Sequence, residues 1–239
     1  MQLSLFTYLS LSVAGFAAAH SWIECTDHDK AGALKKMEDQ AKTDPKGLTP
    51  FDPTVHPELC KAWPRAKENP GDWAVEGRTI AWNIDAAVFL KDRSACSPPQ
   101  REFKPQGPNT PLATAKPGGS IVLRFGGNGH SRGNGTGENG LHGDPGTVEV
   151  FWAGKKETEI KTIDELTDKT SIAKAGFSDE SFALPADPNV KDPPGLQDKG
   201  NWMTVKMPAN MEPGRHMLVW LWSFRNKPQW SSCFDVMIS

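Results

Sequence analysis

Short apolar segments bounded by glycine, proline or asparagine predict β-strands along much of this 239-residue chain. Thr147–Trp152 alternates apolar and polar positions, which predicts a strand with one exposed face. Arg215–Trp222 is apolar almost throughout, as expected of a central strand that is covered on both sides. The predicted strands are His20–Cys25, Ser120–Gly126, Thr147–Ala153, Asn201–Met207, Arg215–Phe224 and Ser232–Ile238.

Two other segments have helical patterns. Ala31–Lys42 repeats its apolar residues at helical spacing, and Thr162–Ala175 opens with a threonine N-cap and acidic residues in the first turn. Long proline-rich connections at 43–83, 97–119 and 183–199 separate the elements. The chain shows no internal repeat and no linker between domains, so the pattern predicts an all-β fold, a single β-sandwich with long loops and a few short helices.

The first 19 residues carry no charged side chain and end in Ala17-Ala18-Ala19. This pattern predicts a secretory signal peptide over 1–19, cleaved after Ala19. A membrane anchor is the alternative, but an anchor needs about 20 apolar residues and serine and threonine interrupt this run. We therefore expect one mature domain over 20–239, secreted and extracellular, with no membrane attachment after cleavage.

Composition narrows the class of the mature protein. Its net charge of −2 comes without a basic stripe, which argues against nucleic acid as a partner. An even number of cysteines in a secreted chain predicts two disulfides with three possible connectivities. No pair has the CxxC spacing of a thiolate zinc site. The cysteines are Cys25, Cys60, Cys96 and Cys233.

Cleavage after Ala19 makes His20 the first residue of the mature chain. A terminal histidine offers two nitrogens, its α-amine and its ring Nδ1, that chelate one metal ion together. The unperturbed pKa of the amine is about 7.7–8.0, so its deprotonation costs little at neutral pH. Amine and imidazole nitrogens in a plane suit copper. His20 is thus one half of a predicted copper site.

His130 is the preferred second ligand. It follows a predicted strand in the turn Gly126-Gly127-Asn128-Gly129-His130, where glycines let the backbone approach a neighbour closely. His142 is the rival, placed between two glycine-rich segments without a strand to anchor it. Among the other histidines, His216 leads an apolar strand and is expected to be structural. His28 and His56 are expected to be solvated.

The mature chain resembles the lytic polysaccharide monooxygenases. The likeness lies in the histidine after the signal, the Asn-Gly-His turn after a strand, and the final segment Trp230-Ser231-Ser232-Cys233-Phe234-Asp235-Val236. The start His20-Ser21-Trp22-Ile23-Glu24-Cys25-Thr26-Asp27 and Cys60 followed by Trp63-Pro64-Arg65 resemble a fungal and oomycete branch. The resemblance implies an immunoglobulin-like sandwich holding one copper ion. It also implies an oxidation beside a glycosidic bond that uses O₂ or H₂O₂ and an external electron donor.

The resemblance assigns His20 and His130 as the metal ligands and Trp230 as the axial neighbour. Family members usually have tyrosine or phenylalanine in the axial place, and often a glutamine two residues before it. Here Pro228 has that place and Gln229, the candidate for the same role, is one residue off. The resemblance also implies the disulfide Cys96–Cys233, and with it Cys25–Cys60.

Three classes of function remain after these observations, the third being a secreted structural β-sandwich in which the N-terminal histidine has no role. The first is oxidative cleavage of a polysaccharide, with cellulose, chitin, xylan and pectin all open; the second is a non-catalytic secreted copper-binding protein of the same fold. Trp63 and Trp73 are expected either to stack on sugar rings or to pack in the core. Asn134-Gly135-Thr136 is an N-glycosylation sequon four residues after His130.

Overall fold

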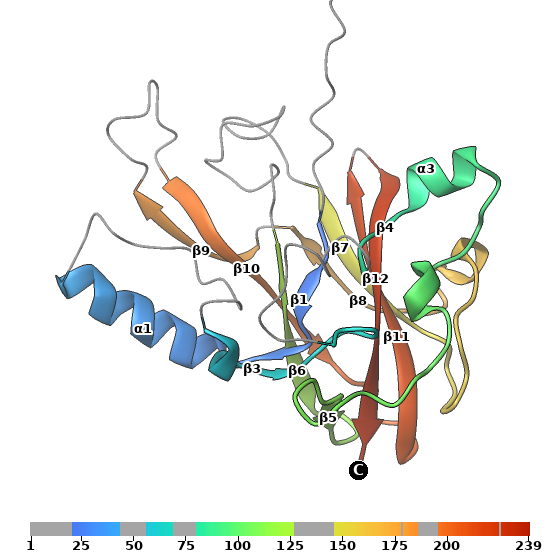
Figure 1. Cartoon of the computed structure of the whole chain (residues 1–239), viewed down its shortest axis with the longest axis horizontal. Coiled ribbons are helices and arrows are strands. Elements are labelled where there is room, and N and C mark those ends of the chain that lie inside the picture. Colours follow the sequence, from blue (N-terminus) through green and yellow to red (C-terminus); the bar gives the residue numbers. More distant parts are fainter. Residues whose placement is uncertain are drawn as a thin grey trace, which may run out of the picture.

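The computed structural model describes residues 21–43, 56–68, 80–126, 146–177, 179–185, 196–224 and 226–239. Two β-sheets face each other across a shared apolar core, which confirms the predicted all-β sandwich (Figure 1). The first sheet has the order β1-β6-β10-β9, with β1 Ile23–Cys25, β6 Ser120–Phe125, β10 Leu196–Lys206 and β9 Glu180–Pro185.

The second sheet has the order β4-β12-β11-β7-β8, and β5 pairs in parallel with β12. Its strands are β4 Trp82–Asn83, β5 Ala113–Ala115, β7 Thr147–Trp152, β8 Ser171–Gly176, β11 Gly214–Phe224 and β12 Lys227–Ile238. A small separate sheet pairs β2 Asp27–His28 with β3 Cys60–Ala62.

Aromatic and aliphatic side chains from both sheets fill the space between them. Leu218, Trp220 and Trp222 alternate along β11 toward this core, and Phe125 of β6 meets Trp220 with 5.3 Å between ring centroids. The opposite side of β11 is covered as well, because Val219 and its neighbours pack under the chain segments that cross this face. Burial on both sides is what the unbroken apolar run of this strand predicts.

One predicted helix is confirmed and the other is largely wrong. The predicted helix Ala31–Lys42 is α1, Lys30–Thr43, which packs Ala33 and Met37 against Trp202. At Thr162 the predicted cap is present, since Thr162 and Glu165 form a capping box, but only the 3₁₀ helix η3, Ile163–Glu165, follows.

The end of that segment, from Ser171 on, is strand β8. It hydrogen-bonds to the free edge of β7, and Ile172, Ala173 and Ala175 pack against the inter-sheet core. Pairing and burial available only in the folded molecule outweigh the weak helical preference of the segment.

Several short elements were not predicted from the sequence pattern, and some of them lie inside the proline-rich connections. They are η1 Pro57–Leu59, η2 Pro98–Gln100 and the helix α3 Ile84–Phe89, besides β2 to β5. Both disulfides tie such connections to the sandwich: Cys25–Cys60 joins β1 to β3, and Cys96–Cys233 joins the 95–101 segment to β12. This is the pairing that the family resemblance implies.

The described part of the chain contains no helix long and apolar enough to cross a membrane.

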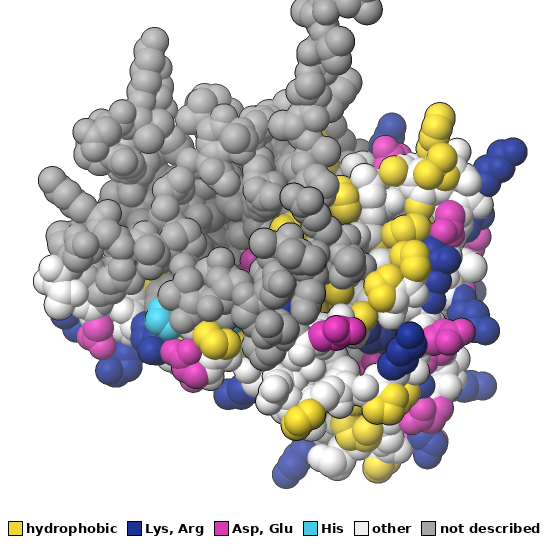
Figure 2. Space-filling view, viewed as in Figure 1, with side chains coloured by type: hydrophobic (Ala, Val, Ile, Leu, Met, Phe, Trp, Pro, Cys, Tyr) yellow, Lys and Arg dark blue, Asp and Glu magenta, His cyan; other side chains and the backbone are white. Residues whose placement is uncertain are grey.

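Hydrophobic side chains gather on the surface around α3, at the upper right of the molecule (Figure 2).

Candidate functional site

Three chain segments that the sequence analysis singled out meet at one end of the sandwich. The Ser21 hydroxyl donates to the carbonyl oxygen of Gly126 at 2.5 Å, and the Gly126 amide donates to the carbonyl of Trp22 at 3.1 Å. The Ile23 amide donates to Oγ of Ser232 at 3.2 Å. The start of β1, the end of β6 and the first half of β12 are therefore bonded to one another.

This meeting point lies beside both predicted ligands in the sequence. His20 directly precedes Ser21, and His130 follows Gly126 by four residues. His20, His130, His142, Asn134 and Trp73 lie outside the described residues. The described chain thus brings together Ser21, the residue after His20, and Gly126, four residues before His130.

Glycine at position 126 leaves room for the Glu24 side chain of β1. A Cβ atom there would lie 2.9 Å from Oε1 of Glu24, tighter than an unstrained contact. Glu24 in turn pairs with Arg124 of β6 at 3.1 Å, and both side chains are largely buried. The charge pair and the glycine together fix how β1 sits on β6.

Trp230 is part of the inter-sheet core at this same end. Its side chain is 7% exposed, and its strand partners are Trp222 on β11 and Asn83 on β4. The structure therefore gives Trp230 a packing role. Its expected role as the axial neighbour of a metal stays a prediction.

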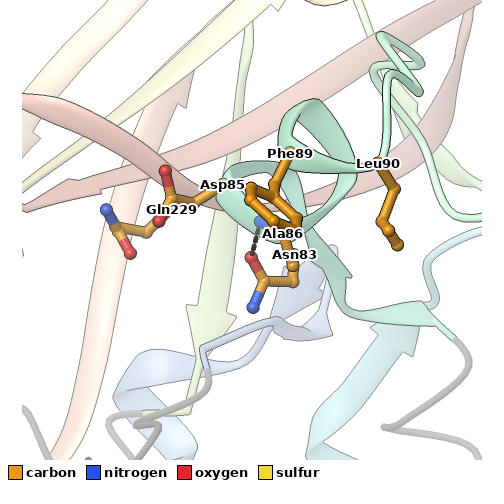
Figure 3. A pocket seen from close by; sticks show the side chains of 6 residues that line it. All are labelled: Asn83, Asp85, Ala86, Phe89, Leu90 and Gln229. Atoms are coloured by element: carbon orange, nitrogen blue, oxygen red, sulfur yellow. Dashed lines mark hydrogen bonds between the residues drawn. The ribbon is translucent and has the colours of Figure 1, made fainter.

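The side chain of Gln229 lies outside the core that surrounds Trp230. The register of β11 against β12 passes from Trp222–Trp230 to Ser223–Pro228, so Gln229 is the extra residue of a β-bulge. Its half-buried side chain lines an open pocket of about 430 Å³ beside α3 (Figure 3). The bulge separates Gln229 from the core that holds its neighbour.

The α3 side of this pocket was not predicted from the sequence. Its lining residues are Asn83, Asp85, Ala86, Phe89 and Leu90. Asn83 is the N-cap of α3, and its side-chain oxygen accepts a hydrogen bond from the Ala86 amide at 2.9 Å (Figure 3). An asparagine before Ile-Asp-Ala-Ala-Val-Phe is a helix-start signal that would have revealed the element.

The expectation that His28 is solvated is wrong. Its side chain is buried, and its Nδ1 accepts a hydrogen bond from Nε1 of Trp202 at 3.1 Å. Burial, with the nearby charge of Arg124, lowers the pKa of His28 to about 3. The ring is therefore neutral and structural. The sequence suggested solvation because charged residues flank His28, yet Trp202 of β10 lies against its ring, with 6.2 Å between the ring centroids.

The other described histidines are also accounted for without a metal. His216 is buried as expected: Nε1 of Trp152 donates to its Nδ1 at 3.0 Å, and its Nε2 lies 2.8 Å from the Glu212 carbonyl. His56 is partly exposed beside Glu58. Among the described residues, no three histidine, cysteine or acidic side chains are grouped as metal ligands would be.

Of the two roles expected for Trp63, the structure shows core packing. It is 2% exposed and packs with the Cys25–Cys60 disulfide and Ile80, so it presents no ring to a sugar.

No protein-family model matches this sequence, and no curated protein matches it. Among solved structures, the chain is similar to a cellulose-active polysaccharide monooxygenase from M. thermophila. The two are 16% identical, the match covers 54% of each chain, and the TM-score is 0.29. The chain thus matches about half the length of that structure, and a likeness at this level carries no argument about the site.

Proposed function

We propose that the mature chain is a secreted, copper-dependent polysaccharide monooxygenase whose single copper ion is held by His20 and His130. The observation that carries the proposal is the contact between Ser21 and Gly126, because it fixes side by side the backbone positions next to His20 and before His130. Four residues span at most about 14 Å, so His130 is within reach of the terminus.

The donor set fits copper. The α-amine and Nδ1 of His20 with one ring nitrogen of His130 give three nitrogens, which suit copper(II). When bound, the ion supplies the oxidising chemistry that, with an external electron donor and O₂ or H₂O₂, hydroxylates a sugar carbon beside a glycosidic bond.

The protein's own residues supply a rigid frame at this end of the sandwich. Backbone bonds between Trp22 and Gly126 and the Ile23–Ser232 bond limit movement of the N-terminal strand. Trp230 and the core below it exclude water from the inner side. Such a frame holds a terminal chelate in one geometry, which a free peptide end does not.

A non-catalytic copper-binding protein is the second candidate, and one observation favours it. The only tyrosine of the chain, Tyr8, lies in the predicted signal, so the mature protein offers no phenolic oxygen to the metal. An indole at Trp230 supplies no oxygen ligand. Copper binding without turnover is the outcome that would identify this second function.

The choice between His130 and His142 is tested by a matched pair of alanine variants. His142 precedes Gly146 by four residues, the same distance in sequence as His130 from Gly126, but only Gly126 is bonded to Ser21. Loss of a group that only supports a ligand typically weakens metal binding about 10- to 100-fold, and loss of the ligand itself costs more. His130→Ala should therefore weaken copper binding by roughly a hundredfold or more, and His142→Ala should leave it nearly unchanged.

Titration calorimetry with copper measures both variants, and mass spectrometry of sugars released in the presence of ascorbate and H₂O₂ measures activity. Oxidised oligosaccharides from the wild type and none from His130→Ala support the enzyme. Tight copper binding with no oxidised product from cellulose, chitin, xylan or pectin contradicts it. The reverse ranking of the two variants overturns His130 as ligand.

A further inference from the structure

The surface around α3 is unusually apolar for a part of the molecule that faces solvent. Phe89 is 86% exposed and Leu90 is 75% exposed, and Val88 before them is 39% exposed. Large contiguous exposed apolar side chains mark binding surfaces more often than isolated ones do. In Figure 2 this region forms a hydrophobic cluster at the upper right, where α3 lies in Figure 1.

These exposed side chains are held in place by the structure of the helix end. The Asp92 amide donates to the Ala87 carbonyl at 2.8 Å and the Lys91 amide to the Val88 carbonyl at 2.9 Å, with Lys91 at φ 65°. This is the bond pattern of a Schellman cap. Asp92 is further fixed by an ion pair with Arg101 at 2.7 Å.

The underside of α3 is anchored as well, because Ile84 and Ala87 are buried, Ile84 in the cluster beneath the second sheet. Phe89 and Leu90 are therefore presented on a fixed support and not on a loose loop, which reduces the entropy that a ligand must overcome to order them.

The position of α3 links this surface to the proposed copper site. Asn83, its N-cap, pairs with Trp230 on β12, and Ser232, two residues further along β12, bonds to Ile23 of the N-terminal strand. The pocket beside Phe89 is completed by Gln229, the residue before Trp230. A polysaccharide bound along α3 would thus lie near the end of the sandwich where β1 begins.

The chemistry of the pocket matches a sugar chain. Phe89 offers an open aromatic face, whose negative quadrupole attracts the C–H bonds on the flat side of a pyranose ring. Asp85, Asn83 and Gln229 add one carboxylate and two amides, the groups that bond sugar hydroxyls. Among the described residues that line it there is no lysine or arginine, so these residues offer no partner for the carboxylates of a polyuronate.

We propose that α3 and Gln229 form a docking surface for a neutral pyranose polysaccharide, with Phe89 stacking on a sugar ring and Asp85 disfavouring acidic chains such as pectate. The orientation of this surface toward the copper rests on the proposed function. The proposal narrows the substrate from four polysaccharides to the three neutral ones, cellulose, chitin and xylan. Docking is a property of the folded chain and does not need the metal.

The test measures binding of the full mature protein to swollen cellulose, chitin, xylan and polygalacturonate, with and without copper. Phe89→Ala should weaken binding to the neutral polymer that the wild type prefers by about tenfold, the loss of one stacked ring. Phe89→Trp should restore it. Met237→Ala is the matched control, an exposed apolar residue of β12 about 26 Å along the strand from Gln229.

Several results would overturn the docking surface. They are equal binding by Phe89→Ala and wild type, preferential binding to polygalacturonate, or a dimer in sedimentation that Phe89→Ala dissolves, which would make this surface a self-association site. The two proposals fail separately: Phe89-dependent binding without copper affinity leaves the docking surface standing, and copper binding without any polysaccharide binding removes it.

Discussion

At the scale of a single residue, Trp230 has one observed role, in packing, and one predicted role, beside the metal. Its ring fills the inter-sheet core at the end of β12, and the family resemblance expects the same ring beside the copper. Tryptophan fills the core because its ring buries a large apolar area, but its indole has no oxygen atom that could bind the metal. If Trp230 lies beside the copper, it would shield that side of the metal from water.

Trp230→Ala tests both roles in one variant. Removing a buried indole should cost about 3–5 kcal/mol of unfolding free energy, and admitting water beside the metal should change the copper EPR spectrum. Thermal melting and EPR on the same sample measure the two effects. Trp230→Phe, which keeps most of the packing, serves if the alanine variant does not fold. A large loss of melting temperature with an unchanged spectrum would remove Trp230 from the site.

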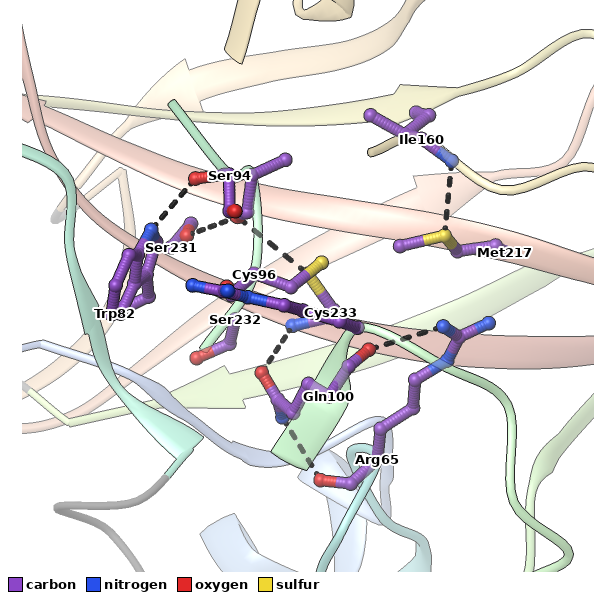
Figure 4. Close-up of a disulfide and its surroundings, with 12 residues drawn as sticks. Arg65, Trp82, Ser94, Cys96, Gln100, Ile160, Met217, Ser231, Ser232 and Cys233 are labelled. Atoms are coloured by element: carbon purple, nitrogen blue, oxygen red, sulfur yellow. Dashed lines mark hydrogen bonds between the residues drawn. A yellow bond between two sulfur atoms is a disulfide. The ribbon is translucent and has the colours of Figure 1, made fainter. Parts of the chain in front are cut away.

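At the scale of elements, a buried charge network joins the chain segments that cover the outer face of the second sheet. Arg65 contacts both oxygens of Asp235 at 2.6 Å, and Arg215 reaches Asp235 at 2.7 Å. Glu159 bonds both arginines, at 2.6 and 2.8 Å. The network lies next to the Cys96–Cys233 disulfide, where Gln100 bridges the Arg65 carbonyl and the Cys233 amide (Figure 4).

Arg65→Met should destabilise the protein by about 3–5 kcal/mol, because it leaves the buried Asp235 carboxylate with only one arginine. Arg93→Met is the matched control: Arg93 pairs with Asp164 on the surface, where both are exposed, and its loss should cost at most about 1 kcal/mol. Urea unfolding measures both variants. Equal losses would mean that the buried network contributes no more than a surface pair.

The same network sets a pH dependence. Burial raises the pKa of Glu159, but hydrogen bonds and charges from Arg65 and Arg215 outweigh burial and lower it overall. A carboxylate with a lowered folded pKa stabilises the fold above its unfolded pKa of about 4.3, and that stability is lost as pH falls through the lowered value. Glu159→Gln should therefore be less sensitive to acid than the wild type over this window.

At the scale of the whole molecule, the strong sequence signals predicted the architecture. Arg215–Phe224 and Ser120–Gly126 have apolar patterns that only buried strands satisfy, and both are found within a residue of their predicted bounds. The helix predicted over Thr162–Ala175 is largely wrong because the edge of β7, the preceding strand, offers a pairing partner to the residues from Ser171 on. The short strands β2 to β5 were missed for the same reason, since long-range pairing defines them and local pattern does not.

The candidate site also combines features that local sequence predicts with features that only the fold reveals. His20 and His130 follow from a cleavage pattern and a turn that are local in sequence. The α3 surface required the fold, because nothing local reveals that Phe89 is left exposed beside Gln229 or that His28 is covered. Long-range contact between β1, β6 and β12 is what turns separate motifs into one candidate site.

The most direct measurement compares copper binding by the mature protein, which begins at His20, with a form that retains Ala19. If the terminal amine is a ligand, the mature form should bind one copper(II) with a nitrogen-rich EPR spectrum, and the extended form should lose that spectrum and most of its affinity, because the amine is displaced by one residue. Identical EPR spectra and affinities for the two forms would contradict a copper site built on His20.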